Sequence, residues 1–439
     1  MGKPGMPIEA MIVIMAVLSI FLLCVGSILG LSYFVLMIVL VRPSCDPLFG
    51  VAKSVLGGEA GPGAAVNVLV IGLGLWYLIQ KPALVGAATL PMWIGFLVVA
   101  SNSAILSPEP TAAARGIGWL ATYFAAFLLP FALIRSPDWA LRCLTAAMYS
   151  SFIPVAYAFI ELVFGLAEVE AGGGRLQSTF SHPNIFAFYL VGVLALDMFM
   201  LKSNQISLPS NVRRLLVLYL PVLILLIVLT QTRSAWFACA IIVAVFAGLV
   251  DRRYLGFLPL LPLIIFIPGI KERILDTNLY NVDYGRDFLD SYAWRRLLWE
   301  KALEWMAANP SVLLGNGLNS FVRHVPAFFP YVREVNDEVG VGPHNVFLQI
   351  YFEMGVLGAV TFGWLFLSLF WKLKDGYRSD AHGTLIMAAF AASYLVECYS
   401  DNMLDYLVYQ WFFWFIMGTV CAWNRLRTRL QVLQPAFVR

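Results

Sequence analysis

One histidine in this sequence is placed to do acid–base chemistry. His344 stands immediately before a long apolar segment, within PHNVFLQIYFEMGVLG at residues 343–358. A neutral imidazole there can accept a proton from a hydroxyl group, because free histidine titrates near pH ~6.5. Asn345 follows it, and Glu353 lies deeper in the same segment, where a carboxyl group must be paired or face an internal cavity. We therefore expect His344 to be catalytic and not only a helix cap, and Glu353 to hold helices or loop backbone without touching substrate.

Three arginines supply the positive charge that an anionic substrate needs. Arg233 lies in a very short connection between two apolar segments, within LTQTRSAWFACA, and its planar guanidinium suits bidentate contact with phosphate. The alternative is an interfacial arginine that reaches lipid phosphate. Arg295 and Arg296 begin the amphipathic stretch SYAWRRLLWEKALEWMAANP, where a cation is unfavourable beside a helix N-terminus. This position indicates a partner anion or, equally, a solvated or lipid-contacting face.

A further cluster lies in GGGRLQSTFSHPNIFAFYL at 172–190. Arg175 follows a run of glycines that would let it reach phosphate. His182 precedes an apolar segment, and Asn184 or Ser181 could cap the helix that begins there, with a proline in its first turn. This pattern favours a structural role over a catalytic one for His182.

Acidic groups gather near the end of the chain, in YSDNMLDYLVYQW. Asp401, Asn402 and Asp405 could balance the arginines, bind sugar hydroxyls or coordinate a metal. Metal is the least favoured, because no cluster has metal-ligand spacing, and we expect neither metal nor cofactor. LLGNGLNSF at 313–321 could bring backbone N–H groups to a phosphate, although a plain turn is the simpler interpretation.

A scaffold of membrane helices must position these residues. The chain has 439 residues, of which 60% are hydrophobic and 13% charged, and its mean hydropathy is +0.80, well outside the range of soluble domains. No internal repeat is visible, so we predict one integral membrane domain, 1–439, that is all-α and polytopic, with roughly twelve transmembrane helices. The apolar stretches lie near residues 8–41, 64–80, 83–101, 116–134, 140–164, 184–201, 215–231, 233–250, 254–269, 345–371, 383–398 and 404–423.

The distribution of charge predicts how these spans are oriented. With a cytoplasmic N-terminus, one side collects sixteen Lys and Arg residues and the short loops of the other side hold five, so both termini are expected in the cytoplasm. The candidate residues fall on the opposite side. There the segment 270–343, between the ninth and tenth spans, is predicted to form a large loop carrying amphipathic helices. One helix predicted in this loop has an apolar stripe, which lies on the membrane surface or packs on the spans; both interpretations stay open. The stripe consists of Trp294, Leu297, Leu298, Ala302, Trp305 and Met306.

This location restricts the chemistry. ATP and nucleotide sugars are cytoplasmic, so an enzyme on the outer side needs a donor that is already activated and already across, such as a lipid-linked pyrophosphate. A transporter is the alternative from another class, but the ionisable residues cluster at one face, and no inverted repeat or pair of broken helices is apparent. The net charge of +3 mostly reflects the Lys and Arg residues that orient the spans in the membrane. Nothing in the sequence indicates nucleic-acid binding. Only Cys45, with Cys398 as a second candidate, could meet the oxidising side, and a disulfide is not expected.

The motifs together resemble the O-antigen ligase and polymerase superfamily of bacterial envelope enzymes. The pattern His344-Asn345-x-x-Leu348, followed by Glu353-x-Gly355-x-x-Gly358, is similar to its signature. RSAW, RRLLWEKAL, LGNGLNSF and STFSHPN look like further landmarks, in the family's order. The likeness covers about residues 170–360 well and the whole helix count loosely.

The resemblance implies a metal-independent, inverting membrane glycosyltransferase. It would work at the periplasmic face of the bacterial inner membrane on undecaprenyl-pyrophosphate-linked glycan. Arg233 and one of Arg295 or Arg296 would hold the donor pyrophosphate, and His344 would activate the acceptor hydroxyl. The R-x-x-x-W spacing favours Arg295, but the doubled arginine leaves this choice open.

The family includes polymerases, which extend a lipid-linked repeat, and ligases, which attach glycan to lipid A core. RPSCDP at 42–47 and the C-terminal aromatic run look more like polymerases of exopolysaccharide clusters. A surface polysaccharide polymerase is therefore the favoured interpretation, with a ligase as the alternative. The expected partners are the lipid-linked donor, a glycan or lipid A-core acceptor, membrane lipids and other polysaccharide assembly proteins.

Overall fold

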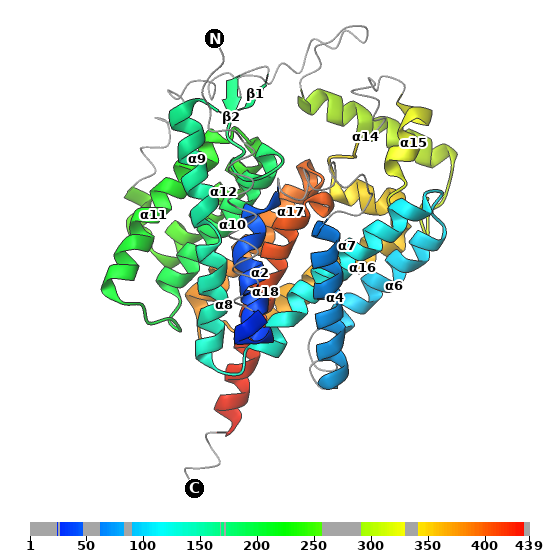
Figure 1. The fold of residues 1–439 in the computed structure, drawn as a ribbon. Coiled ribbons are helices and arrows are strands. Elements are labelled where there is room, and N and C mark those ends of the chain that lie inside the picture. The colour runs from blue at the N-terminus through cyan, green and yellow to red at the C-terminus, as the bar shows by residue number, and fades with distance from the viewer. Residues whose placement is uncertain are drawn as a thin grey trace.

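The structure is a computed structural model that describes residues 24, 27–46, 62–82, 90–166, 168–170, 173–256, 291–329 and 341–433. Helices dominate this part of the chain, and its strands form one short antiparallel hairpin (Figure 1). Eight of the described helical stretches are long and apolar enough to cross a membrane, and two shorter apolar ones accompany them. The protein is therefore an all-α polytopic membrane protein.

Prolines begin several of the helices in the first half of the chain. Pro110, Pro137 and Pro183 each occupy the first turn, where the N–H that proline lacks would have no partner within the helix. The elements of this half are α2 (Leu31–Val41), η1 (Arg42–Ser44), α4 (Pro62–Gln80), α6 (Leu90–Ile105), α7 (Pro110–Leu133), α8 (Pro137–Tyr149), α9 (Phe152–Phe164), β1 (Glu168–Glu170), β2 (Gly173–Arg175) and α10 (Pro183–Lys202).

Side-chain caps begin two helices of the second half. Asn345 accepts the Leu348 N–H at the start of α16, and Asp380 accepts the Gly383 N–H at the start of α17, at 3.0 and 2.9 Å. The elements are α11 (Ser210–Leu229), α12 (Arg233–Val245), η3 (Phe246–Val250), α14 (Ser291–Ala308), α15 (Phe321–Phe328), α16 (Val346–Lys374), α17 (Ala381–Ser400), η5 (Met403–Asp405) and α18 (Leu407–Leu433).

Helix α10 forms the centre of the bundle. Every residue from Pro183 to Leu201 is buried, and the helix packs against α8, α11, α12, α17 and α18. Helix α18 runs beside it and along α7, where the rings of Trp93, Phe127 and Trp414 meet edge to face or tilted, with centroids 4.6 to 6.2 Å apart. This dense interior gives the ends of the helices fixed positions.

The amphipathic helix expected around residue 300 is α14. It lies with α15 at the end of the bundle opposite to the last turns of α18 (Figure 1). Leu298 and Ala302 on its stripe are fully buried in a cluster with Phe321 of α15 and Phe352 of α16. The stripe therefore packs on a neighbouring helix and on a spanning helix, which decides between the two interpretations of the sequence.

Helix α16 is broken in its middle, a feature that the sequence did not reveal. Gly355 has φ 65° and ψ −163°, far from helical values. The glycine-rich segment 311–320 fills the break: the N–H of Gly317 donates to the carbonyl of Glu353 at 3.0 Å, and N–H groups beyond the break donate back to the segment. Gly355 therefore occupies a position where the chain must take a left-handed conformation to accommodate the inserted loop.

The single span expected at 140–164 corresponds to one stretch that is long and apolar enough to cross a membrane, Pro137–Phe164, within which α8 and α9 meet at Ser150 and Ser151. The span expected at 254–269, most of the first stretch and much of the loop 270–343 lie outside the described residues. All six cysteines are free thiols, so Cys45 and Cys398 are not paired.

Candidate active site at one end of the bundle

Asp401 is the centre of a polar network at the end of the bundle that carries α14. Its side chain is buried in the turn after α17 and accepts hydrogen bonds from Asn184 Nδ2 and from the Tyr406 hydroxyl, both at 2.5 Å. Burial alone raises the pKa of Asp401, but the hydrogen bonds and charges of His344, Tyr406 and Arg295 outweigh it and hold that pKa below its ordinary value. The carboxylate therefore stays ionised at neutral pH and can orient cationic and N–H groups.

His344 stands beside this carboxylate. Its Nδ1 lies 3.7 Å from Asp401 Oδ1 and 3.4 Å from Asn402 Nδ2, and its side chain is 29% exposed. The backbone of His344 has φ 47°, in the left-handed region that side chains rarely adopt, and its N–H donates to Asn402 Oδ1 at 2.6 Å. The Trp294 ring and the imidazole also meet edge to face, with centroids 6.0 Å apart. With Nδ1 directed at the acid, Nε2 is the nitrogen left for a substrate hydroxyl.

Arg175 links the two halves of the chain but is buried and committed to protein acceptors. Its Nε donates to the Thr230 carbonyl at 3.1 Å, and its Nη2 donates to Asn184 Oδ1 at 2.7 Å and to Thr232 Oγ1 at 3.1 Å. These contacts oppose the phosphate contact predicted for Arg175. Arg175 is therefore a structural residue that positions Asn184 against Asp401.

Arg233 begins α12, directly after the threonine that contacts Arg175. It is partly exposed at the same end of the bundle as His344. The short turn before it is held by its own contacts: Gln231 has φ 53°, and the Trp236 indole donates to the Ile227 carbonyl at 3.1 Å. The backbone that carries Arg233 is therefore held in place by these contacts.

The neighbouring arginines of α14 have different surroundings. Arg295 Nη1 donates to the carbonyl of Ser400 at 2.7 Å, the residue immediately before Asp401, and its charge lowers the pKa of that acid. Arg296 is exposed. One turn further along the helix, Trp299 Nε1 donates to the carbonyl of Pro343 at 2.7 Å, immediately before His344. Geometry thus brings Arg295, and not Arg296, to the histidine and the acid.

The remaining predicted residues have structural contacts. His182 caps α10 by accepting the Asn184 N–H on its Nδ1 at 3.1 Å, so the cap expected from Asn184 or Ser181 was wrong, while the structural role of His182 fits. Glu353 is buried, and its Oε1 lies 3.4 Å from the N–H of Phe321, at the end of the glycine-rich loop. This contact agrees with the expectation that Glu353 holds loop backbone.

The glycine-rich loop itself does not present its N–H groups to a ligand. The N–H groups of Asn316 and Gly317 donate to carbonyls of α16, and that of Leu318 donates to the Ser103 carbonyl at 3.2 Å. The phosphate interpretation of this loop was therefore wrong, because its donors close the break in α16. Among the described residues, no group of three or more His, Cys, Asp and Glu side chains is placed to share a metal ion.

Several partners in the network were missed from the sequence. Asn184 appeared only as a possible cap, and neither Thr232 nor Tyr406 was singled out. Asn402 was noticed as a turn residue, yet it holds both the backbone and the ring of His344. The only sequence feature that pointed to these partners was their position as polar residues at the ends of apolar segments. Polar residues at such positions usually cap a helix or face solvent, so this feature did not distinguish them.

The fold and this site together define a class: a polytopic α-helical membrane protein whose arginines, histidine and acid meet at one end of the bundle. Residues 218–363 match the family model described as O-antigen ligase, which confirms the resemblance to the O-antigen ligase and polymerase superfamily and supports an enzyme of that type. The match includes Arg233, Arg295 and His344 and ends before Asp401. A comparison with curated proteins found no match.

Proposed function

We propose that the protein is a membrane glycosyltransferase that takes glycan from undecaprenyl pyrophosphate at the periplasmic face of the bacterial inner membrane. Both termini would then lie in the cytoplasm. The observation that carries the proposal is the arrangement of His344, Asp401 and Arg295 at one end of the bundle. The family match over residues 218–363 supports the class of reaction.

In the proposed reaction, His344 is the general base. Asp401 would accept a hydrogen bond from Nδ1–H and hold the ring, so that Nε2 removes the proton from the acceptor hydroxyl and the carboxylate stabilises the resulting imidazolium. The hydroxyl oxygen forms a bond to the anomeric carbon as the bond from that carbon to the pyrophosphate oxygen breaks. The configuration inverts, and undecaprenyl pyrophosphate leaves with the bonding electrons.

Two arginines would stabilise the departing pyrophosphate. Arg295 has one N–H committed to Ser400, and its other guanidinium N–H groups have no hydrogen-bond partner among the described residues. Arg233 would contact the second phosphate from α12. Guanidinium groups fixed before the reaction stabilise charge that develops in the transition state without further reorganisation. Arg175 holds the network and does not touch the donor in this scheme.

The test is transfer by the purified protein. Lipid-linked glycan and acceptor, with chelator present and no nucleotide, should yield longer or transferred glycan. His344→Ala should lower the rate by roughly 10² to 10⁴-fold. His382→Ala, at the opposite end of α17, is the matched control and should keep full activity. Full activity of His344→Ala would remove the proposed base.

We favour a surface polysaccharide polymerase over a ligase. The support is the sequence likeness of RPSCDP and of the C-terminal aromatic run to polymerases. A deletion strain separates the two roles. Loss of long chains with one-repeat forms retained indicates a polymerase, whereas accumulation of long lipid-linked chains indicates a ligase.

A transporter is the second candidate, and the break in α16 is the observation that favours it. Broken helices form substrate sites in many transporters. Here the segment 311–320 occupies the break, and its N–H groups are committed to α16. Glycan-dependent flux in proteoliposomes that persists in Arg233→Ala would support transport and contradict transfer.

A further inference from the structure

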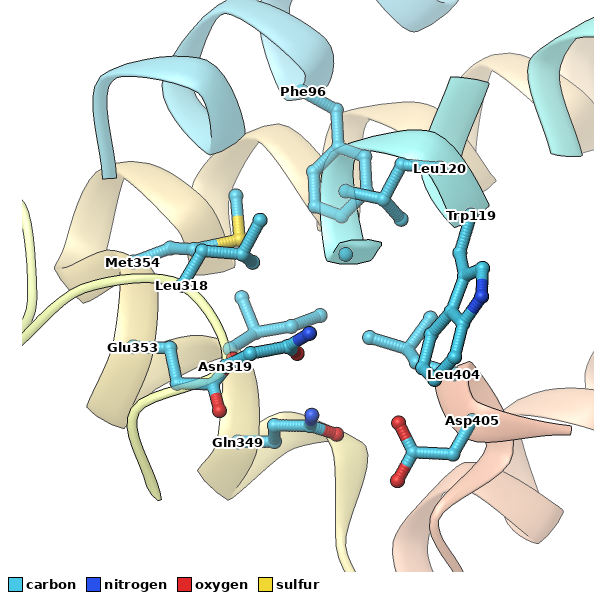
Figure 2. Close-up of a pocket in the computed structure, with 12 residues that line it drawn as sticks. Phe96, Trp119, Leu120, Leu318, Asn319, Gln349, Glu353, Met354, Leu404 and Asp405 are labelled. Carbon is cyan, nitrogen blue, oxygen red and sulfur yellow. The ribbon is translucent and has the colours of Figure 1, made fainter. Parts of the chain in front are cut away.

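A small cavity lies between α6, α7, α16 and η5, and its lining includes Gln349, five residues after His344, and Asp405, four residues after Asp401. Helix α16 leads into it, because Gln349 follows one turn after Asn345 and its N–H donates to the Asn345 carbonyl at 2.9 Å. Figure 2 shows the side chains of Gln349 and Asp405 facing one another across this space, with Asn319 beside them. Apolar side chains from α6, α7 and α16 close the far side, and an indole from α7 lies to one side.

Four polar side chains line the cavity: Asn319, Gln349, Glu353 and Asp405. Gln349 is 5% exposed, and its Oε1 has no hydrogen-bond partner among the described residues. Asp405 also lines this space; the residue is exposed, and no described residue donates a hydrogen bond to its carboxylate. The Asn319 Nδ2 is already committed to the Ala112 carbonyl at 2.8 Å. A buried acceptor without a donor is costly, so the Gln349 amide oxygen favours a group that brings an O–H donor into the cavity.

The walls are held from several directions. The Tyr123 hydroxyl of α7 donates to the Leu404 carbonyl beside Asp405 at 2.7 Å, and the Ser107 hydroxyl donates to the Leu318 carbonyl at 2.9 Å. A Cβ at Gly116 would lie 2.8 Å from Asn319 Nδ2, so α7 approaches the loop as closely as a glycine allows. The cavity is therefore a formed feature of the bundle.

Its size limits what can enter. The cavity volume is about 20 Å³, which is room for one or two water molecules and far too little for a sugar ring. A hydroxyl or hydroxymethyl group fits. The rest of a sugar would have to stay outside this space, and Trp119, which lines the cavity and is partly exposed, is the aromatic side chain beside it.

We propose that this cavity is a specificity pocket for the sugar acceptor, which receives one exocyclic hydroxyl or hydroxymethyl group between Gln349 and Asp405 while the ring rests on Trp119. This inference rests on the proposed transferase function and assigns these side chains to the acceptor. Both acceptors take O–H donors from the sugar. The pocket selects among acceptors by the group that it admits, and the donor pyrophosphate is held elsewhere, by the arginines.

The experiment measures acceptor and donor separately in the full-length protein. Gln349→Leu and Asp405→Asn are compared with wild type and with Asp375→Asn, an exposed aspartate at the opposite end of the bundle. Transfer from lipid-linked glycan gives the KM for acceptor and for donor. Thermal stabilisation by undecaprenyl pyrophosphate reports binding at the arginines. Methyl hexosides and methyl pentosides, which differ by the hydroxymethyl group, serve as competing probes.

We expect acceptor KM to rise about tenfold or more in Gln349→Leu and Asp405→Asn, with donor KM and stabilisation by undecaprenyl pyrophosphate within twofold of wild type. Wild type should be inhibited more by hexosides than by pentosides, and the variants should lose this preference. An unchanged acceptor KM in both variants overturns the pocket while transfer itself stands. Absence of transfer by wild type overturns the proposed function and the pocket with it.

Discussion

His344 depends on Asp401 and Asn402 for its orientation, and this dependence can be measured. Asp401→Asn keeps the size of the side chain but removes the charge that holds the Nδ1 proton. We expect kcat to fall about 10²-fold with acceptor KM little changed, because the base is present but misdirected. Transfer kinetics over a range of pH would measure this. A variant with wild-type kcat would show that Asp401 does not orient the base.

The same substitution has a signature in stability. Because the pKa of Asp401 is lower in the folded state than in the unfolded chain, its ionised form stabilises the fold above the unfolded pKa of about 4. That stabilisation is lost as pH falls through the lowered value. The melting temperature of Asp401→Asn should therefore lie below that of wild type at pH 7, and the gap should narrow below about pH 4.

Arg295 and Arg296 form a matched pair within one helix turn. Arg295 reaches the carbonyl beside Asp401, whereas Arg296 is exposed. Arg295→Ala should lower the transfer rate by roughly 10² to 10³-fold and weaken stabilisation by undecaprenyl pyrophosphate. Arg296→Ala should stay within about twofold of wild type. Equal losses in the two variants would contradict the assignment of the donor to Arg295.

At the residue scale, the sequence indicates which side chains are candidates for the site, but it does not indicate which other side chains they contact. The sequence singled out His344, Arg233 and Arg295 as candidates because charges and imidazoles at helix ends are rare and costly. It did not show that Asn184 and Thr232 lie within reach of the Arg175 guanidinium. Such partners are brought together by tertiary packing, which local patterns do not encode.

At the scale of elements, the break in α16 is the feature with the clearest consequence. A Cβ at Gly355 would lie 2.4 Å from the backbone of Leu313, and the residue has a positive φ. Gly355→Ala should lower stability by at least about 2 kcal/mol and reduce activity, because it expels the loop that Glu353 holds.

Gly363 is the matched control in the same helix, since a Cβ there would meet open space. Gly363→Ala should be neutral or stabilise by up to about 1 kcal/mol, because alanine is the better helix former. Fluorescence-detected size-exclusion after heating would compare the two variants. A Gly355→Ala protein as stable as wild type would mean that the break is not required.

Hydropathy predicted most of the helices because apolar length is a strong signal. It could not predict the break, since glycines within an apolar run usually mark close helix packing. Nor could it separate α8 from α9, whose joint at Ser150 and Ser151 carries no strong breaker. The stripe of α14 was recognised, but only contacts with α15 and α16 show what it packs against.

For the whole molecule, the expected orientation can be tested by labelling. Single cysteines at Arg296 and Ser379, at opposite ends of the bundle, would be introduced into a cysteine-free background. In intact cells with a permeable outer membrane, an impermeant maleimide should label Arg296→Cys and spare Ser379→Cys. Labelling of the second position alone would place the site on the cytoplasmic side and contradict the proposed donor.

The hydrogen bond from Asn184 to Asp401 joins residues 217 positions apart. A ribosome therefore inserts the central helix long before it makes the acid that completes the network. Nascent or prematurely terminated chains that end before α17 can bear the arginine of α12 and the histidine of α16, yet they lack the carboxylate that orients the imidazole. If the proposed mechanism holds, such fragments would be inert until α17 and the turn after it are made.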